Sequence, residues 1–67
     1  MAVAKIIEVT ASSTDSFEEA IRAGIAKASE TVRNIQGAWV KEQKVRVDGQ
    51  GSISEFRVDL KVTFLLD

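Results

Sequence analysis

The sequence predicts an α+β fold of order β-α-β-β, in which one helix packs on a three-stranded antiparallel sheet. Three observations predict it: a capping box that opens one helical segment, a glycine-containing turn, and a last segment in which apolar and charged residues alternate. A right-handed crossover through the helix leaves the first two strands parallel with the third between them, so we expect the strand order 1-3-2. At this length, residues 1–67 are expected to form a single domain.

The first strand is expected over residues 3–10. This segment is rich in β-branched side chains, and Val3, Ile7 and Val9 fall on one alternating face, with Lys5 as the exception. The polar residues that follow are expected to end the strand.

The helix is expected over residues 17–33. Ser16 and Glu19 form a capping box, in which the serine side chain accepts from the backbone and the glutamate reaches back. Apolar residues then recur at spacings of three and four, so one side of the helix packs on the sheet. Asn34 and Gly37 are expected to end the helix.

Two further strands are expected over residues 38–48 and 52–66. The Asp-Gly-Gln-Gly sequence at residues 48–51 indicates a hairpin turn, because both glycines accept a positive φ without penalty. The last strand is the most regular one and suits the central place in the sheet.

The two hairpin strands differ in pattern. Trp39, Val45 and Val47 fall on one parity of the first, and Val40 falls on the other. In the last strand we expect one core face, made of Phe56, Val58, Leu60, Val62, Phe64 and Leu66. Its other face carries charges of alternating sign, Glu55, Arg57, Asp59 and Lys61. These charges favour cross-strand ion pairs on a solvated face, and the alternative is a charged surface that meets a ligand or a subunit.

Self-association is expected from size alone. A domain of this length buries only about 60% of its unfolded surface, and the chain has neither cysteine nor histidine for a disulfide or a zinc site. A 17-residue helix is about 25 Å long, whereas a 15-residue strand is about 50 Å long, so the strand ends overhang the helix. Burial between subunits would cover them.

Composition excludes several functions. A formal net charge of -1 gives no bulk attraction to nucleic acid or to an anionic membrane, and no apolar stretch is long enough to span a bilayer. Without cysteine and histidine the usual nucleophilic pairs and the usual general base are absent, so we expect no enzyme. The N-terminal residues lack the apolar core of a secretory signal, and a cytoplasmic location is expected.

Two features could bind a ligand. Trp39 is the only tryptophan, and an indole serves as an interface or core anchor or as a stacking platform. The carboxylates Asp15, Glu18 and Glu19 complement the helix dipole, or they form half of a calcium site that a symmetry mate completes.

Five segments resemble the dodecin family. They are ASS at residues 11–13, SFEEAI at 16–21, TVRNI at 31–35, VKEQ at 40–43 and FRVDLKVTF at 56–64. The resemblance spans almost the whole chain and the same β-α-β-β order. It implies a hollow homododecameric shell that stores and sequesters flavin, with FMN or a related flavin stacked in pairs between aromatic side chains near a symmetry axis.

The chain departs from the family pattern at two places. In flavin-binding dodecins the stacking tryptophan falls three residues after the position of Asn34, where Gly37 stands here, and a glutamate falls where Trp39 stands. The indole is thus displaced by two residues, which keeps it on one strand face but moves it about 7 Å along the strand. The family also tends to carry a glutamine where Arg57 stands.

The resemblance therefore supplies two hypotheses. In the first, the shell binds flavin or a related coenzyme, and Trp39 stacks on the ring. Arg57 and Lys44 contact polar or phosphate groups of the ligand. Gln43 or Gln36 forms a hydrogen bond with a ring edge, and Gly37 lies beside these residues. In the second, the shell has lost flavin binding and is structural, or holds calcium or other ions at Asp15, Glu18, Glu19 or Asp59.

Overall fold

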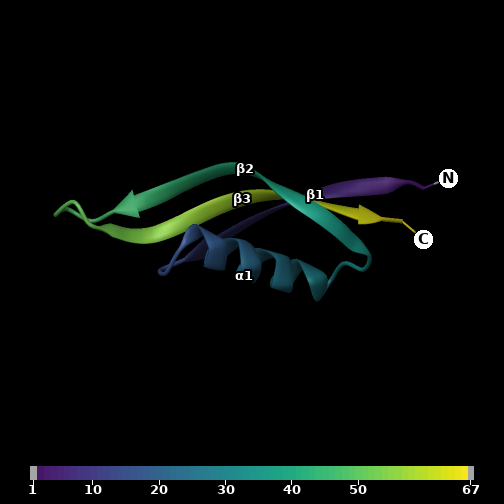
Figure 1. Ribbon diagram of the computed structural model, residues 1–67, viewed down its shortest axis with the longest axis horizontal. Coiled ribbons are helices and arrows are strands. Elements are labelled where there is room, and N and C mark those ends of the chain that lie inside the picture. The colour runs from purple at the N-terminus through teal and green to yellow at the C-terminus, as the bar shows by residue number, and fades with distance from the viewer. Residues whose placement is uncertain (1, 67) are drawn as a thin grey trace.

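The computed structural model describes residues 2–66, and it has the expected order of elements. The elements are β1 (Ala4–Ser13), α1 (Phe17–Ser29), β2 (Ile35–Val47) and β3 (Ile53–Leu65). β3 lies between β1 and β2 and is antiparallel to both, and α1 covers one face of the sheet (Figure 1). The predicted fold class and the strand order 1-3-2 are confirmed.

β1 is longer than the sequence suggested. The polar residues after position 10 were expected to end the strand, but pairing continues with Ala11 opposite Val58 and Ser13 opposite Phe56. Ala11 also packs against the core cluster on the helix side. Long-range backbone pairing with β3 thus prevails over the weak strand propensity of alanine and serine.

α1 ends at Ser29 rather than at residue 33. The backbone N–H of Glu30 donates to the Lys27 carbonyl at 3.2 Å, which tightens the last turn. Asn34 then adopts a positive φ of 64°, a conformation that asparagine tolerates better than most residues. In the described part of the chain, no helix combines the length and the apolar character that crossing a membrane requires.

Gly37 does not end the helix, because it lies inside β2. This strand begins at Ile35, three residues before the predicted start at residue 38, and Gln36 forms a bulge between the paired residues Ile35 and Gly37. The early start places Gly37 on the sheet, where a Cβ would meet no atom within 4 Å.

A second bulge, at Lys41, changes the parity of β2. Trp39 lies opposite Lys61, whereas Val45 lies opposite Phe56, so the two side chains are on opposite faces of the sheet. The expectation that Trp39 and Val45 share a face is therefore wrong. One extra residue in a strand reverses the alternation beyond it, and sequence parity does not reveal that residue.

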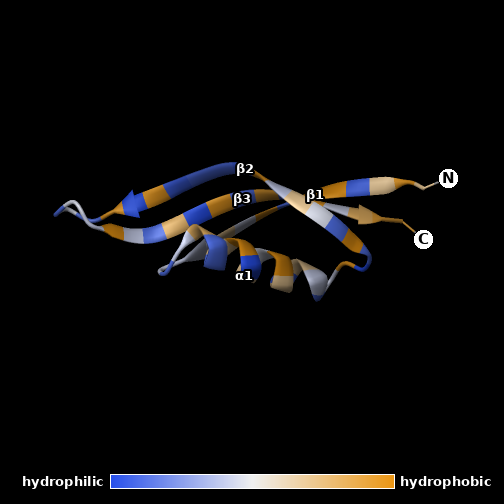
Figure 2. Ribbon diagram, in the orientation of Figure 1, coloured by the Kyte–Doolittle hydropathy of each residue, from blue (hydrophilic) through white to orange (hydrophobic). Residues whose placement is uncertain are grey.

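The core lies between the centre of β3 and α1. Val58, Leu60 and Val62 are almost fully buried, as the alternating pattern predicted. Toward the ends of the same face, burial falls, and Leu66 is exposed. Figure 2 shows the matching alternation of apolar and polar residues along β3. Coverage by α1 therefore limits the length of the core.

The turn between β2 and β3 uses one glycine rather than two. Gly51 has a positive φ of 86°, but Gly49 does not. The Asp48 carboxylate accepts hydrogen bonds from the backbone N–H groups of Gln50 and Ser52, at 2.8 and 3.0 Å, and the bond from Gln50 contributes most to lowering the pKa of that carboxyl. The predicted hairpin is confirmed, with an aspartate-centred turn at its tip.

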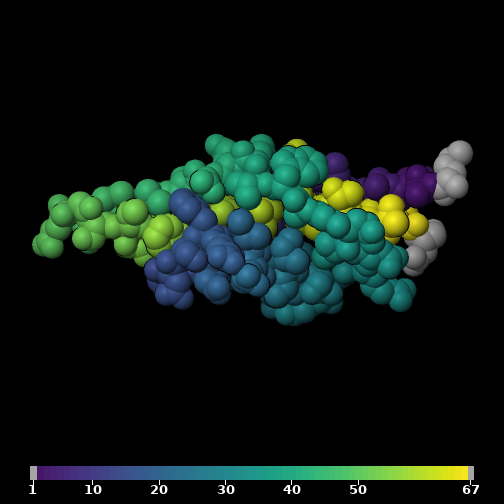
Figure 3. Space-filling model, viewed as in Figure 1, coloured from purple at the N-terminus to yellow at the C-terminus, as the bar shows by residue number. Residues whose placement is uncertain are grey.

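The hairpin projects beyond the rest of the molecule. β1 stops pairing at Phe56, so the hairpin arm, which we define as residues 46–55, has only two strands. The molecule is accordingly elongated, with extents of 53 × 19 × 13 Å, and the arm extends past α1 (Figure 3). Val47 and Ile53 on the arm are 54% and 51% exposed. The predicted overhang is present.

Close packing at Gly24 provides a test of the core. A Cβ at this position would lie 3.0 Å from Leu60 Cδ1 and 3.1 Å from Ala11 Cβ. We predict that Gly24→Val lowers the free energy of unfolding by about 1–3 kcal/mol, because the helix cannot move away from β3 without exposing the core. Ala23→Val, at an exposed site on the same helix, should cost only about 0.5 kcal/mol. Equal losses in urea denaturation would contradict this account.

Candidate functional site

The sheet has one face that α1 does not cover, and we call it the helix-free face. Residues paired directly across antiparallel strands share a face, so the register assigns its members. They include Glu8, Thr10 and Ser12 on β1, Glu55, Arg57, Asp59, Lys61 and Thr63 on β3, and Gly37, Trp39, Glu42 and Lys44 on β2. Most of the charged side chains of the sheet thus lie on a single surface.

The predicted ion pairs on this face are present in part. The Glu8 carboxylate lies 3.9 Å from Lys61 Nζ on the next strand and 3.4 Å from Lys41 Nζ, which reaches across from β2. Arg57, by contrast, pairs with Glu55 of its own strand, at 2.7 Å. These groups are partly exposed, so each pair contributes little to stability.

Trp39 is 49% exposed and lies opposite Lys61 on the helix-free face. Gly37, on the same face, leaves open space next to the indole along the strand. A half-exposed indole beside a residue without a side chain offers a flat apolar surface that a planar molecule can cover.

Arg57 and Lys44 lie opposite each other, farther along the helix-free face. Arg57 is four residues from Lys61 on β3, which corresponds to about 13 Å. The structure therefore brings these two predicted site residues together but separates them from Trp39 within one chain.

The two glutamines lie elsewhere. Gln43 is opposite Val58, whose side chain points to the core, so Gln43 belongs to the face that carries α1. Gln36 is a bulge residue, and its Nε2 donates to the Asn34 carbonyl at 3.3 Å. In a single chain Gln43 thus lies on the opposite face of the sheet from Trp39, whereas Gln36 and Trp39 both line one apolar groove.

An open groove lies between α1 and β2. Its volume is about 460 Å³, and its lining is mainly apolar. The lining residues are Ile21, Ile25, Ile35, Gln36, Gly37, Ala38, Trp39, Val40 and Leu60. α1 packs over β1 and β3, which leaves the edge strand β2 uncovered on this side.

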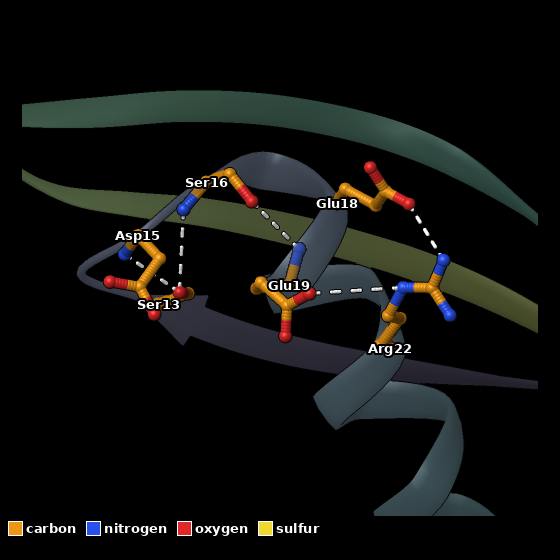
Figure 4. Close-up of polar contacts among 6 residues, drawn as sticks. All are labelled: Ser13, Asp15, Ser16, Glu18, Glu19 and Arg22. Atoms are coloured by element: carbon orange, nitrogen blue, oxygen red, sulfur yellow. Dashed lines mark hydrogen bonds and ion pairs between the residues drawn. The ribbon is translucent and has the colours of Figure 1, made fainter.

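Asp15, Glu18 and Glu19 of the predicted cation site lie at the start of α1 and form polar contacts there (Figure 4). Ser16 Oγ accepts from the Glu19 N–H at 3.0 Å, which confirms the serine half of the predicted capping box. The other half is wrong, because the Ser16 N–H donates to Ser13 Oγ at 3.4 Å and the Glu19 carboxylate faces Arg22. Glu18 accepts a 2.7 Å hydrogen bond from Arg22, and this bond is the main cause that raises the pKa of Arg22. Asp15 contributes its N–H, which donates to Ser13 Oγ at 2.9 Å.

Asp59 lies away from these carboxylates, on the helix-free face, where Thr10 Oγ1 donates to it at 2.9 Å. Across residues 2–66, no three acidic side chains gather closely enough to hold a metal ion. The four residues named for the alternative cation site are thus not brought together in one chain.

Three charged residues near the row of Trp39 were not predicted as site residues. Glu8 forms ion pairs with Lys41 and Lys61, and Lys61 lies opposite Trp39. The register of β1 with β3 could have identified Glu8, since both strands were predicted. The contact of Lys41 depends on the bulge, for which the sequence contains no clear signal.

The chain matches a family model described as Dodecin over residues 3–67. It is 36% identical over 64 residues to "Calcium dodecin" of Mycobacterium tuberculosis, which covers 96% of this chain and 89% of the relative. It is 34% identical over 65 residues to "Dodecin" of Thermus thermophilus, covering 97% and 93%. The solved structure of dodecin from Streptomyces davaonensis superposes with a TM-score of 0.91 at 30% identity, covering 98% of this chain and 96% of that one.

Proposed function

The chain belongs to the dodecin family, and from this we propose that it is a self-assembling storage protein that binds FMN or a related planar coenzyme. The observation that carries the proposal is the position of Trp39, a half-exposed indole on the helix-free face with open space at Gly37. A planar ring fits this surface, because stacking covers the indole without displacing a side chain.

More than one copy is needed for the site. Trp39 lies about 13 Å along the sheet from the cross-strand pair Arg57 and Lys44. We therefore propose that a ring stacked on the indole of one copy contacts Arg57 and Lys44 of a neighbouring copy. Gln43 would likewise act from a second copy, whereas Gln36 lines the same groove as Trp39 and would need only a side-chain rearrangement. Stacking between copies would hold the ring away from solvent and quench its fluorescence.

Assembly into a homododecamer, which the family resemblance implies, is supported by the apolar surface of the single chain. The groove between α1 and β2 is open, and the hairpin arm exposes Val47 and Ile53. An isolated two-stranded arm is marginally stable in water, so a partner that covers it stabilises both the arm and the assembly.

Storage fits the chemistry better than catalysis. A flavin supplies redox chemistry wherever it binds, but the 67 residues include no histidine or cysteine to move a proton or form a covalent bond with a substrate. We therefore propose a binding protein rather than an enzyme. A chain without cysteine gains nothing from an oxidising compartment, which supports a cytoplasmic location.

A calcium-binding shell is the second candidate, and a relative 36% identical to this chain that is named "Calcium dodecin" favours it. Calcium takes six to eight oxygen ligands, and the carboxylates of Asp15, Glu18 and Glu19 lie away from Asp59 within one chain. A calcium site would therefore need oxygens from several copies, as the flavin site does.

A fluorescence titration tests the first proposal. We expect the fluorescence of FMN, riboflavin or lumichrome and the fluorescence of the tryptophan to be quenched together, at a fixed ratio of ligand to subunit. Trp39→Ala should raise the dissociation constant by about fivefold to 150-fold, since stacking on an aromatic side chain contributes about 1–3 kcal/mol. Trp39→Phe, which keeps a ring, should bind with intermediate affinity. Unchanged affinity in the alanine variant would exclude Trp39 from the site.

Light scattering after gel filtration tests assembly. Val47→Lys should reduce the molecular mass in solution, because a charge on the arm opposes burial between copies. Gln50→Lys, at the exposed turn of the same hairpin, is the matched control and should leave the mass unchanged. If the wild-type protein has the mass of one chain, the assembly proposal is wrong.

Thermal melts separate the two candidates. A cation that binds only the folded assembly raises its melting temperature, so calcium should stabilise a calcium shell and a chelator should destabilise it. The combined change of Asp15→Asn and Glu18→Gln should remove that response if these carboxylates are ligands. A melting temperature that neither calcium nor chelator moves would eliminate the second candidate.

A further inference from the structure

A row of three side chains crosses the helix-free face beside the proposed stacking surface. Glu8 on β1 lies opposite Lys61 on β3, and Lys61 lies opposite Trp39 on β2. Directly opposite residues on one face have Cβ atoms about 4.5–5.5 Å apart, so the lysine stem lies next to the indole. Lys61 is thus the cation on β3 whose position is nearest to Trp39.

The ammonium of Lys61 retains capacity to bind a ligand. Its Nζ lies 3.9 Å from Glu8 Oε1, which is an ion pair but is longer than a hydrogen bond. The same carboxylate also lies 3.4 Å from Lys41 Nζ. The single negative charge of Glu8 therefore neutralises neither lysine completely. A lysine ammonium has three donors, and its side chain here is 35% exposed.

Arg57 cannot perform this role in the same copy. Its position is about 13 Å from that of Lys61 along β3, and its guanidinium is held by Glu55 at 2.7 Å. On the side of Trp39 away from Arg57, the next cross-strand pair is Gly37 and Thr63, and neither residue is charged. On the opposite side, the next row carries the carboxylates of Asp59 and Glu42, and Thr10 donates to Asp59 at 2.9 Å. Within one chain, the indole therefore has an ammonium across the sheet, open space toward Gly37 and two carboxylates in the other direction along the strand.

We propose that Lys61 recognises the carbonyl-rich edge of a planar ring stacked on Trp39, and that Glu8 positions the Lys61 ammonium. This inference rests on the proposed function and specifies its ligand class: planar heteroaromatic molecules with hydrogen-bond acceptors or negative charge on the ring edge. Recognition through the ring makes the contribution of Lys61 independent of any phosphate on the side chain of the ligand.

Parallel titrations with FMN and riboflavin test the assignment. Lys61→Met keeps an unbranched apolar stem without the charge, and it should raise the dissociation constants of both ligands by a similar factor of about five to ten. Lys27→Met, an exposed lysine on α1, is the control and should change neither constant. Thermal melts of both variants check that the fold is retained.

A second variant tests the positioning role of Glu8. Glu8→Gln removes the charge that holds the Lys61 ammonium beside the indole, so both ligands should bind several-fold more weakly. In the Lys61→Met background the same change should have no effect, because the group on which Glu8 acts is gone. A side chain with only a structural role would produce no such coupling.

Three outcomes would overturn the inference. If Lys61→Met weakens FMN alone, the ammonium binds the phosphate and not the ring edge. If neither ligand is affected by Lys61→Met while Trp39→Ala weakens the binding of both, the proposed function stands and Lys61 has no part in it. If the wild-type protein binds neither ligand, the proposed function and the inference both fail.

Discussion

The fold and the candidate site both depend on β3, which has one apolar, buried face and one charged, helix-free face. This central strand pairs with both neighbours, so its backbone is satisfied and its side chains alternate strictly between two environments. One face buries Val58, Leu60 and Val62 beneath α1, and this burial fixes the register of all three strands. The same register then places charges and Trp39 on the other face. A one-residue slip would bury the charges, so core packing also determines the composition of the candidate site.

The sequence predicted those features that depend on local pattern. The alternation along β3, the serine cap at Ser16 and the turn at Asp48 each involve contacts within a few residues, and each is present in the structure. Features that depend on distant partners were predicted less well. β1 continues through Ala11 because β3 pairs with it, and the bulge at Lys41 transfers Val45 to the other face from Trp39. The composition of the candidate site follows from these long-range pairings, which no short segment specifies.

Within one chain, the surfaces that we propose for assembly and for ligand binding are both incomplete. On the helix side, α1 covers only part of the apolar surface, so the groove beside β2 and the hairpin arm are exposed. On the helix-free side, Trp39 and Arg57 are too far apart to hold one ring. Contacts between copies would complete both. Apolar burial would then supply the energy of assembly, and the polar face would be free to specify the ligand, since exposed ion pairs add little stability.

The two-residue displacement of the indole changes which groups surround it. A tryptophan at the position of Gly37 would lie opposite the neutral Thr63, whereas Trp39 lies opposite Lys61 and in the same row as Glu8. The shift therefore exchanges a neutral neighbour for a charged pair without changing the face on which the indole lies. A stacking platform tolerates many planar rings, because stacking depends on area more than on substituents. In the site that we propose, the charged pair would allow this surface to discriminate among them, so the displacement would affect specificity as well as position.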